Sequence, residues 1–204
     1  MPPVKTFRPA LSHVPARPAR FLGSLACMLG WVLAVASCSP ANQYYLLTPE
    51  GPAPSSGGMG IGVGPVSIAS YLERDNIVFQ ESSNHLAVSA SHRWAGDLDN
   101  NIAQVLATNL GRRLHTGNVT TYPWYNDHEL RYQITVDVRQ LHGTADGDAF
   151  LDAAWRVYSL PDRRMVANRN WSGTEPLEVD GYNSLAAAES KLLARLATQI
   201  AESM

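Results

Sequence analysis

The chain has 204 residues, of which 45% are hydrophobic, and its formal net charge is −2 at pH 7. Four of its 16 basic residues, but none of its 18 acidic residues, lie in the first 37 positions, so the remaining 167 residues carry 12 basic and 18 acidic side chains. A net charge near −6 argues against nucleic acid as a partner and against a basic membrane-binding face. A stretch of that length is enough for one domain with its own core.

The N-terminal stretch is typical of a secretory signal peptide. Four basic residues precede an apolar run that begins at Phe21 and ends in small residues. The sequence Val-Ala-Ser-Cys at residues 35–38 resembles a bacterial lipobox, in which the leader is cut off before a cysteine that takes a diacylglyceryl group. We therefore expect residues 1–37 to be a lipoprotein signal peptide, with cleavage between Ser37 and Cys38 and lipidation of Cys38.

An uncleaved transmembrane helix is the alternative interpretation. The apolar run of 17 residues is at the short limit for spanning a bilayer, and it contains two glycines. Cys27 is a rival acceptor, but Ser24 is unsuited to the position three residues before a cut, and the apolar run continues beyond it. With Cys38 as the one mature cysteine, no disulfide is expected. Apart from the diacylglycerol and N-acyl chain on Cys38, the sequence indicates no cofactor.

The first predicted strand covers residues 43–47, and a loop rich in proline, glycine and serine follows at 49–60. Glycines alternate with apolar residues at 60–66. A phosphate-binding loop is the less favoured interpretation of this stretch, because no Lys-Ser/Thr pair and no helix pattern follow. We expect a strand whose glycines let another segment approach closely. The next predicted elements are a turn or short helix at 70–75 and a hairpin of strands at 77–80 and 86–89.

Apolar residues recur at three- and four-residue spacing from Leu98 to Leu114 and predict an amphipathic helix with one buried face. Asp97 or Asp99 is expected to cap its first turn, and Gly117 is expected to end it.

Strict alternation of apolar and polar residues at 130–139 is the clearest strand signal in the chain. Further strands are predicted at 119–122, 151–157 and 165–172, and a second amphipathic helix at about 183–202, capped by Asn183 or Ser184. The predicted fold class is α+β, a mostly antiparallel sheet of about seven or eight strands with two amphipathic helices packed on one face.

No catalytic chemistry is indicated. The five histidines after the leader are scattered and show no metal-ligand spacing. No Gly-x-Ser-x-Gly nucleophile motif is present. Asp146-Gly147-Asp148 lacks the other oxygen ligands of a calcium loop and is predicted to form a turn. We therefore predict no catalytic residue, no metal site and no enzyme activity.

Several stretches of the chain resemble a known family in their order and spacing beside the lipobox. They are Tyr44–Leu47, Gly62–Ile68 with Tyr71, Leu72 and Arg74, Ile77–Val78, Arg93–Ala95 running into Leu98–Ile102, and Thr121–Trp124 followed by Tyr132–Val138. Together they are similar to the PqiC-type proteins, the ABC-type transport auxiliary lipoproteins of Gram-negative bacteria. The resemblance spans nearly all of the chain after the leader.

This resemblance implies an outer-membrane lipoprotein that faces the periplasm, with residues 60–204 as its auxiliary domain and residues 38–59 as a lipidated tether, first strand and loop. It also implies partners: a PqiB-like MCE protein that extends from the inner membrane, and a PqiA-like membrane protein. Such an assembly carries lipids between the two membranes and supports envelope integrity. Ser39, next to the anchor, agrees with outer-membrane sorting.

The favoured hypothesis is a non-enzymatic adaptor that docks on the distal end of an MCE tunnel. The candidate partner contacts are glycine-rich segments, strand edges and the residues Tyr71, Arg93, Trp94 and Trp124. A ring-forming homo-oligomer would suit this role. One alternative is an auxiliary lipoprotein of an MCE system with an ABC transporter. Another is a stand-alone lipid-binding lipoprotein, which predicts a sizeable apolar cavity between sheet and helices. A periplasmic hydrolase ranks last, because no motif supports it.

Overall fold

The structure is a computed structural model that describes residues 41–126 and 128–204. Ser37, Cys38 and the predicted signal peptide lie outside the described residues. Asn42–Met204 forms one compact unit, so the first strand and the loop after it belong to the same unit as the predicted auxiliary domain. Neither long helix in the described part of the chain is apolar enough to cross a bilayer.

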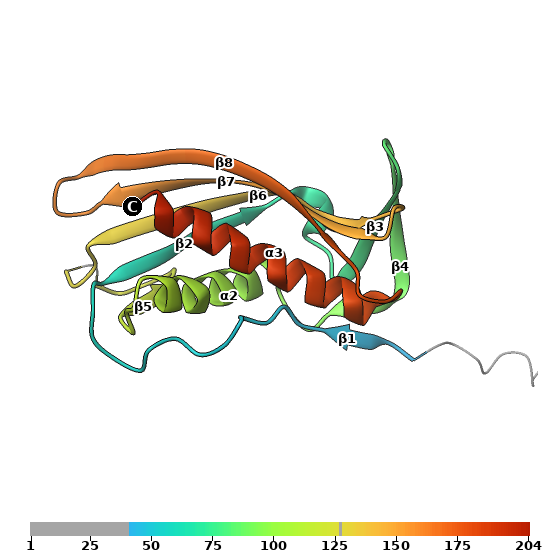
Figure 1. The fold of residues 1–204 in the computed structure, drawn as a ribbon, viewed down its shortest axis with the longest axis horizontal. Helices are drawn as coiled ribbons and strands as arrows, with labels where there is room; N and C mark the ends of the chain where they lie inside the picture. The colour runs from blue at the N-terminus through green and yellow to red at the C-terminus, as the bar shows by residue number, and fades with distance from the viewer. Residues whose placement is uncertain (1–40, 127) are drawn as a thin grey trace, which may run out of the picture. The chain divides into compact units, whose positions relative to one another are not determined.

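Eight strands and two long helices make up the unit (Figure 1). Both numbers agree with the prediction from the sequence. The elements are β1 (Gln43–Tyr45), β2 (Ile61–Ile68), the 3-10 turn η2 (Ser70–Leu72), β3 (Asn76–Ser82), β4 (His85–Trp94), α2 (Leu98–Arg113), β5 (Val119–Thr121), β6 (Tyr132–Thr144), β7 (Asp148–Ser159), β8 (Arg164–Pro176) and α3 (Tyr182–Glu202).

Strand β6 is the centre of the sheet. On one side it pairs in parallel first with β2 and then, near its end, with β3. On the other side it pairs antiparallel with β7, which pairs antiparallel with β8. β5 extends the sheet beyond β2, and β4 and then β1 extend it beyond β3. The sheet is therefore mixed but mostly antiparallel, and the predicted meander of three successive strands is confirmed.

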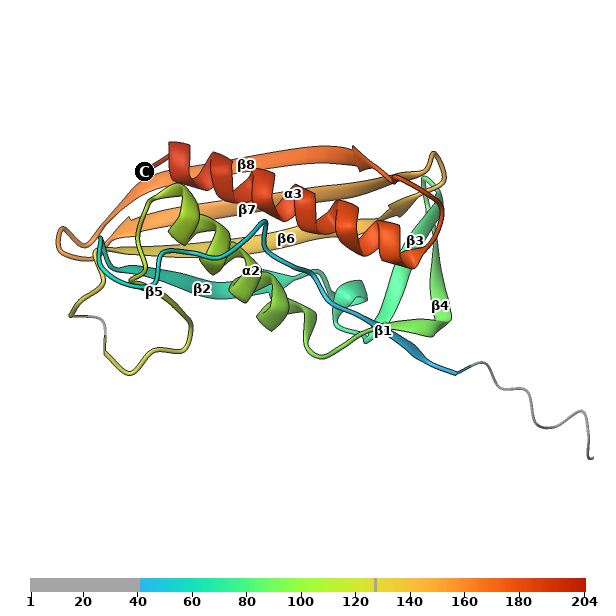
Figure 2. The same cartoon turned by 60° about the horizontal axis from the view of Figure 1, so that its bottom comes forward.

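Both helices cover the same face of the sheet (Figures 1 and 2). α2 packs on β2 and β5, α3 packs on β7 and β8, and the two helices contact each other. Their inward side chains are completely buried, and burying each such side chain contributes roughly 1.5–3 kcal/mol. The fully buried residues on the two helices include Ile102, Leu106, Leu110, Leu192, Leu196 and Ile200. The predicted apolar stripes are thus the faces that hold the helices on the sheet.

Strand ends differ from the prediction in several places. The β3–β4 hairpin has only Ser83 and Asn84 between its strands, so its turn is tighter than expected. β4 continues to Trp94, because its last residues pair in parallel with β1, where Tyr45 lies opposite Trp94. β8 continues to Pro176, because β7 offers it a partner along its whole length. Pairing with a neighbour, which the local pattern does not reveal, sets these ends.

The termini of α2 also differ from the prediction. Asp97 occupies the N-cap position but makes no side-chain bond to the backbone, and it accepts instead from the Asn100 amide at 3.3 Å. The helix ends before Gly117, because His115 adopts the left-handed conformation with φ 51°. Gly117 serves another purpose, since a Cβ there would collide with the backbone of the 54–56 loop.

The start of α3 depends on glycine instead of a side-chain cap. Gly181 is the N-cap residue, and neither Asn183 nor Ser184 caps the helix. The Ser184 hydroxyl accepts from the Val179 backbone N–H at 3.2 Å, so it stabilises the loop before the helix.

Gly62 of β2 and Gly60 just before it confirm the expected close approach of another segment. A Cβ on Gly62 would lie 2.9 Å from the Trp124 ring, and one on Gly60 would overlap the Glu129 carbonyl. The loop between β5 and β6 therefore lies directly against β2. This contact positions Trp124, one of the predicted partner contacts.

Candidate functional site

The four predicted contact residues do not form one site. Tyr71 lies in η2, Arg93 and Trp94 end β4, and Trp124 lies in the loop between β5 and β6. The η2 turn and the end of β4 are linked, because the Trp94 N–H donates to the Asp75 carbonyl at 2.6 Å. Trp124 lies apart from them, against Gly62 of β2. These residues therefore lie in two separate regions of the fold.

Tyr71 is half-buried and holds η2 against β6. Its hydroxyl accepts a hydrogen bond from the Leu141 N–H at 3.2 Å. Burial raises the pKa of Tyr71, the Leu141 hydrogen bond opposes that shift, and the nearby Glu189 carboxylate adds to it. The phenol is therefore neutral at physiological pH. It acts as a hydrogen-bonding and packing group.

Arg93 lies over the same turn, with its guanidinium Nη1 3.8 Å from an Asp75 carboxylate oxygen. Its Nε is buried and has no hydrogen-bond partner among the described residues. Beside this turn, η2, the loop after it and the start of α2 border a surface pocket of about 400 Å³, whose charged lining residues are Glu73, Arg74, Asp75, Asp97 and Asp99. This part of the surface is therefore predominantly acidic.

Trp94 belongs to the core. Its side chain is only 5% exposed. It therefore offers almost no surface to a partner, and of the four predicted contacts only Tyr71, Arg93 and Trp124 remain partly accessible. The sequence could not separate Arg93 from Trp94 in this respect, because the orientation of the two side chains follows from the pairing of β4.

Trp124 anchors an aromatic loop. Its ring meets that of Tyr122 edge-on, with the centroids 5.4 Å apart and the planes at 90°. Such a pair contributes about 0.5–1.5 kcal/mol beyond its burial. Tyr122 is 53% exposed, and Tyr125 is fully exposed. Trp124 thus fixes a loop that presents two further aromatic rings, which sequence reasoning did not single out as contacts.

Two buried ionisable groups also escaped the sequence analysis. Glu189 on α3 is 1% exposed, and burial raises its pKa to about 8. His142 on β6 is 2% exposed, and burial lowers its pKa. The ring nitrogens of His142 lie 3.1 Å from the Gly143 carbonyl and 3.2 Å from the Gln140 amide oxygen. Both groups are neutral at pH 7, so neither supplies a charge to a site.

The space between sheet and helices is filled by side chains. Ile134, Leu151 and Leu193 are among the fully buried residues that occupy it. The apolar pocket of the described residues lies at the surface where α3 begins. It measures about 240 Å³ and is lined by Phe79, Leu177, Gly181, Tyr182 and Leu185. The pockets found among the described residues open at the surface, and none of them is the sizeable interior cavity that a stand-alone lipid-binding protein requires.

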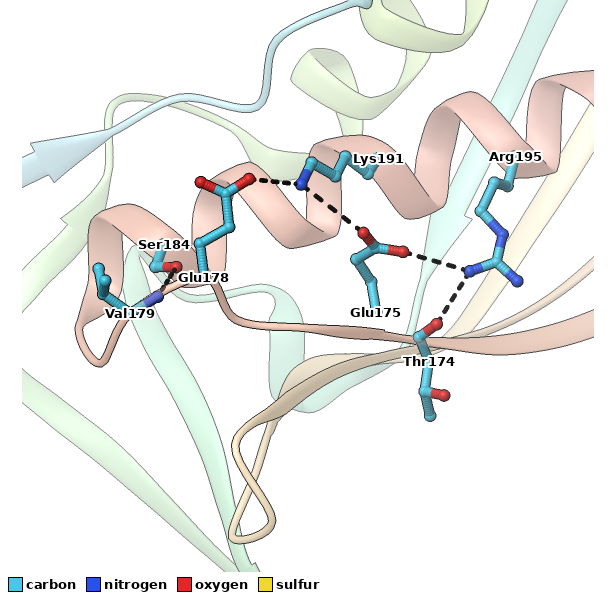
Figure 3. Close-up of polar contacts among 7 residues, drawn as sticks. All are labelled: Thr174, Glu175, Glu178, Val179, Ser184, Lys191 and Arg195. Atoms are coloured by element: carbon cyan, nitrogen blue, oxygen red, sulfur yellow. Dashed lines mark hydrogen bonds and ion pairs between the residues drawn. The ribbon is translucent and has the colours of Figure 1, made fainter.

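A polar network fastens α3 to the end of β8 (Figure 3). The Lys191 ammonium lies 2.8 Å from Glu178 and 3.7 Å from Glu175. Arg195 donates to the Thr174 carbonyl at 2.9 Å and lies 3.4 Å from Glu175. The Glu178 contact raises the pKa of Lys191 and lowers that of Glu178. Because most of these groups are exposed, we expect the ion pairs to contribute little to the stability of the fold.

Within the described ranges, no group of three His, Cys, Asp or Glu side chains is arranged to hold a metal ion. What the structure offers is a sheet-and-helix scaffold with an acidic turn, an aromatic loop and a long edge strand.

Comparison with known proteins identifies the class. Residues 44–201 match the family described as the ABC-type transport auxiliary lipoprotein component. The chain belongs to this family, which confirms the resemblance seen in the sequence.

Individual relatives are distant. The chain is 22% identical over 187 residues to the intermembrane transport lipoprotein PqiC of Escherichia coli (strain K12), covering 86% of this chain and 97% of that protein. The PqiC of Shigella flexneri matches with the same values. A crystal structure of an uncharacterized protein shares the fold with a TM-score of 0.67 at 20% identity, covering 80% of this chain and 98% of the other. A crystal structure from Xanthomonas campestris gives a TM-score of 0.57 at 18% identity, covering 79% and 91%.

Proposed function

We propose that the protein is a non-enzymatic outer-membrane lipoprotein and an accessory subunit of a PqiAB/MCE-type lipid transport system. In this role it tethers or caps the distal end of the periplasmic MCE tunnel and supports envelope integrity. The similarity to PqiC over 97% of that protein's length, within a shared family, is the observation that carries the proposal. The filled core favours an adaptor role over a role as a lipid-binding protein.

The anchor in this proposal is Cys38, freed by cleavage after Ser37 and carrying a diacylglyceryl group and an N-acyl chain. Two or more chains hold a protein stably on a membrane. β1 begins at Gln43, five residues after the anchor, and so short a stretch spans at most about 17 Å. The domain would therefore stay close to the outer membrane.

A pull-down of the periplasmic MCE protein tests the docking role. The intact lipoprotein, extracted in mild detergent, should recover a PqiB-like protein from envelope material. A Cys38→Ser variant should leave the membrane fraction yet still bind the purified periplasmic MCE part. Mass spectrometry should find Cys38 acylated at the N-terminus of the mature chain. Failure of the intact lipoprotein to recover the MCE protein would contradict the docking role.

Tyr71, Arg93 and Trp124 remain the proposed contacts. Replacing each of them by Ala should weaken recovery of the MCE protein, whereas Arg113→Ala at the far end of α2 should not.

Size-exclusion chromatography with light scattering would reveal a homo-oligomer suited to capping a tunnel.

The family description favours one variant of this function, an MCE system driven by an ABC transporter. The neighbouring genes discriminate between the two. PqiA-like and PqiB-like reading frames would establish the first system, and an ATPase and permease pair would establish the second.

A further inference from the structure

The apolar pocket at the start of α3 is built from three parts of the fold. Phe79 comes from β3, Leu177 follows β8 directly, and Tyr182 and Leu185 lie in the first turn of α3. A Cβ on Gly143 of β6 would lie 2.7 Å from the Phe79 ring and 3.3 Å from Leu185, so this glycine lets both side chains approach the sheet closely. The lining side chains are aliphatic or aromatic, and the pocket therefore suits a hydrocarbon group.

The size and openness of the pocket restrict what it can bind. Its volume is about 240 Å³, below the range of about 300–1,000 Å³ that is typical of small-molecule sites. A methylene group is similar in size to a water molecule, whose share of the liquid is about 30 Å³, so the pocket can hold on the order of eight methylene groups. Phe79, Leu177 and Tyr182 are each partly exposed. A single slender chain can therefore enter from solvent without disturbing the core.

The start of β1 lies beside this pocket (Figures 1 and 2). Gln43, the first residue of β1, pairs with His92 of β4. The His92 ring stacks on the Tyr182 ring, with the centroids 3.9 Å apart and the planes at 15°. The Tyr45 hydroxyl lies 2.7 Å from His92 Nδ1 and fixes the orientation of that ring. Two contacts therefore connect the first residue of β1 to a side chain that lines the pocket.

The nearest hydrocarbon that the chain itself can supply is the lipid on Cys38. Cys38 precedes Gln43 by five residues, a stretch that reaches at most about 17 Å. An acyl chain adds its own length to this reach, so it can enter the pocket. Attachment through so short a tether gives the chain an effective concentration on the order of millimolar at the pocket. A free lipid or a partner side chain has no such advantage.

We propose that the pocket at the start of α3 receives one acyl chain of the protein's own anchor on Cys38 while the protein is in water. The inference rests on the lipidation of Cys38 in the proposed function. A bilayer takes up the whole of each acyl chain, whereas the pocket takes up only part of one chain. The chain therefore leaves the pocket when a membrane is available. In this way the domain shields part of its own anchor before it reaches the membrane.

The experiment uses the mature chain from Cys38, in which this residue is the one cysteine. Its thiol is coupled to a hexadecyl maleimide that carries a photoreactive diazirine near the chain end. After illumination in detergent-free buffer, mass spectrometry should locate most crosslinks on Phe79, Leu177, Tyr182 or Leu185. Adding phosphatidylethanolamine–phosphatidylglycerol vesicles should reduce these crosslinks by roughly fivefold or more, because the bilayer competes for the chain.

Two matched variants test the pocket itself. Leu177→Glu places a charge against the hydrocarbon, so it should reduce the pocket crosslinks by roughly fivefold or more. Val179→Glu makes the same kind of change in the same loop, at a side chain that is 70% exposed and does not line the pocket. It should leave the crosslinks within about twofold of the parent. Melting curves establish that both variants are folded, and the competition by vesicles in the parent does not depend on either variant.

The outcomes separate this proposal from the docking role. Crosslinks scattered over the surface, or equal pocket crosslinking in the two variants, would overturn the pocket while leaving the proposed function intact. An unmodified Cys38 in the native lipoprotein would overturn both. Mixing with an isotope-labelled, unalkylated copy distinguishes the source of the chain, and crosslinks mainly to the labelled copy would assign the pocket to another molecule's anchor. Weaker recovery of the MCE protein by Leu177→Glu, with unchanged crosslinking, would assign the pocket to that partner and reject the proposal.

Discussion

Glu189 is a carboxyl group enclosed by the core. Its Oε2 has no hydrogen-bond partner among the described residues, and burial raises its pKa to about 8. The folded state therefore holds a proton that the unfolded state, with an ordinary pKa of 4.5, gives up. The contribution of Glu189 to the free energy of unfolding is fully present below pH 4.5. It is lost as pH rises toward 8, by at most about 1.4 kcal/mol per pH unit.

Replacing this group should flatten that dependence. Glu189→Gln keeps the shape but cannot ionise, so we expect it to be more stable than the parent by roughly 2 kcal/mol or more at pH 8. At pH 5 the two proteins should be similar. Denaturant unfolding between pH 5 and pH 8 provides the measurement. Glu178→Gln, at a fully exposed carboxylate, is the control, and a Glu189→Gln slope equal to that of the control would contradict the buried neutral carboxyl.

His115 is a second residue whose effect on the free energy of unfolding can be measured. A left-handed φ of 51° is unfavourable for a side chain with a Cβ and is easy for glycine. His115→Gly should therefore raise stability by about 0.5–1 kcal/mol. Gly117→Ala should lower it, because the added Cβ meets the backbone of Ser56. Thermal melting of both variants checks the result, and the opposite signs would confirm where α2 ends.

Single residues were predictable only where their type determines their conformation. Glycine is the usual signal for a helix end, so the sequence predicts that α2 ends at Gly117. A histidine in the left-handed conformation has no such sequence signal. The sequence does contain a signal for Glu189, because this residue lies four positions after Leu185 and three before Leu192, on the apolar stripe of its helix. A charged residue at such a position indicates a buried ionisable group. The location of Cys38 rests on the lipobox alone and stays a prediction.

At the scale of elements, the segment after β1 is held by side chains of both helices. Asn101 of α2 accepts from the Leu47 N–H at 2.8 Å and donates to the Leu47 carbonyl at 3.2 Å. Ser190 of α3 accepts from the Thr48 N–H at 3.0 Å. Asn109 of α2 accepts from the Glu50 N–H at 3.0 Å. These side chains supply the hydrogen bonds that a neighbouring strand would otherwise provide, and they satisfy backbone groups that lie beside the core.

Removing one of these side chains should loosen the segment. Asn101→Ala leaves the Leu47 N–H and carbonyl without partners and should cost about 2 kcal/mol. Asn100→Ala, one position along on the exposed side of α2, should cost less than about 0.5 kcal/mol. Urea unfolding gives the two values, and hydrogen exchange should rise at residues 47–48 in the first variant only. Equal effects would show that Asn101 does not hold this segment.

Elements with a buried and a wet face were predictable, and so was the strand at β1, but the partners of strands that pair over long distances were not. The alternation at residues 130–139 identified β6 because Ile134, Val136 and Val138 all face the helices. The three residues of β1 pair in parallel with β4, almost fifty positions later in the chain. No local pattern records such a partner. The same limit explains why β4 and β8 are longer than expected.

At the scale of the whole molecule, the residues from Asn42 onward form one unit, which therefore starts before the glycine-rich loop. We expect a chain shortened to residues 42–204 to unfold in one cooperative transition, because these residues form one compact unit. Shortening it further to residues 60–204 removes β1 and Leu47, whose side chain is only 2% exposed. That loss should cost about 2–4 kcal/mol. Calorimetry of the two chains measures the difference, and equal stability would show that the N-terminal segment is only a tether.

The fold class and the family were readable from the sequence, whereas the surfaces were not. Periodicity gave the helices and the meander, and motif spacing gave the family. Candidate contact residues followed from residue type, so a core tryptophan was included. Strand edges are also expected to make contacts, but the sequence does not reveal that β8 forms one. An edge is a property of the assembled sheet, because it is defined by the strand that is missing beside it.

The order of strands around β6 has a consequence for how the chain assembles. Ile61 of β2 lies beside Tyr132 of β6, so β2 can pair with β6 only after a segment about seventy residues later has been made. Closing loops of that length is slow, because the loss of chain entropy comes before the stabilising contacts form. Apolar strands stay exposed to solvent until then. A newly made copy would therefore be open to aggregation through these strands until β6 has been made.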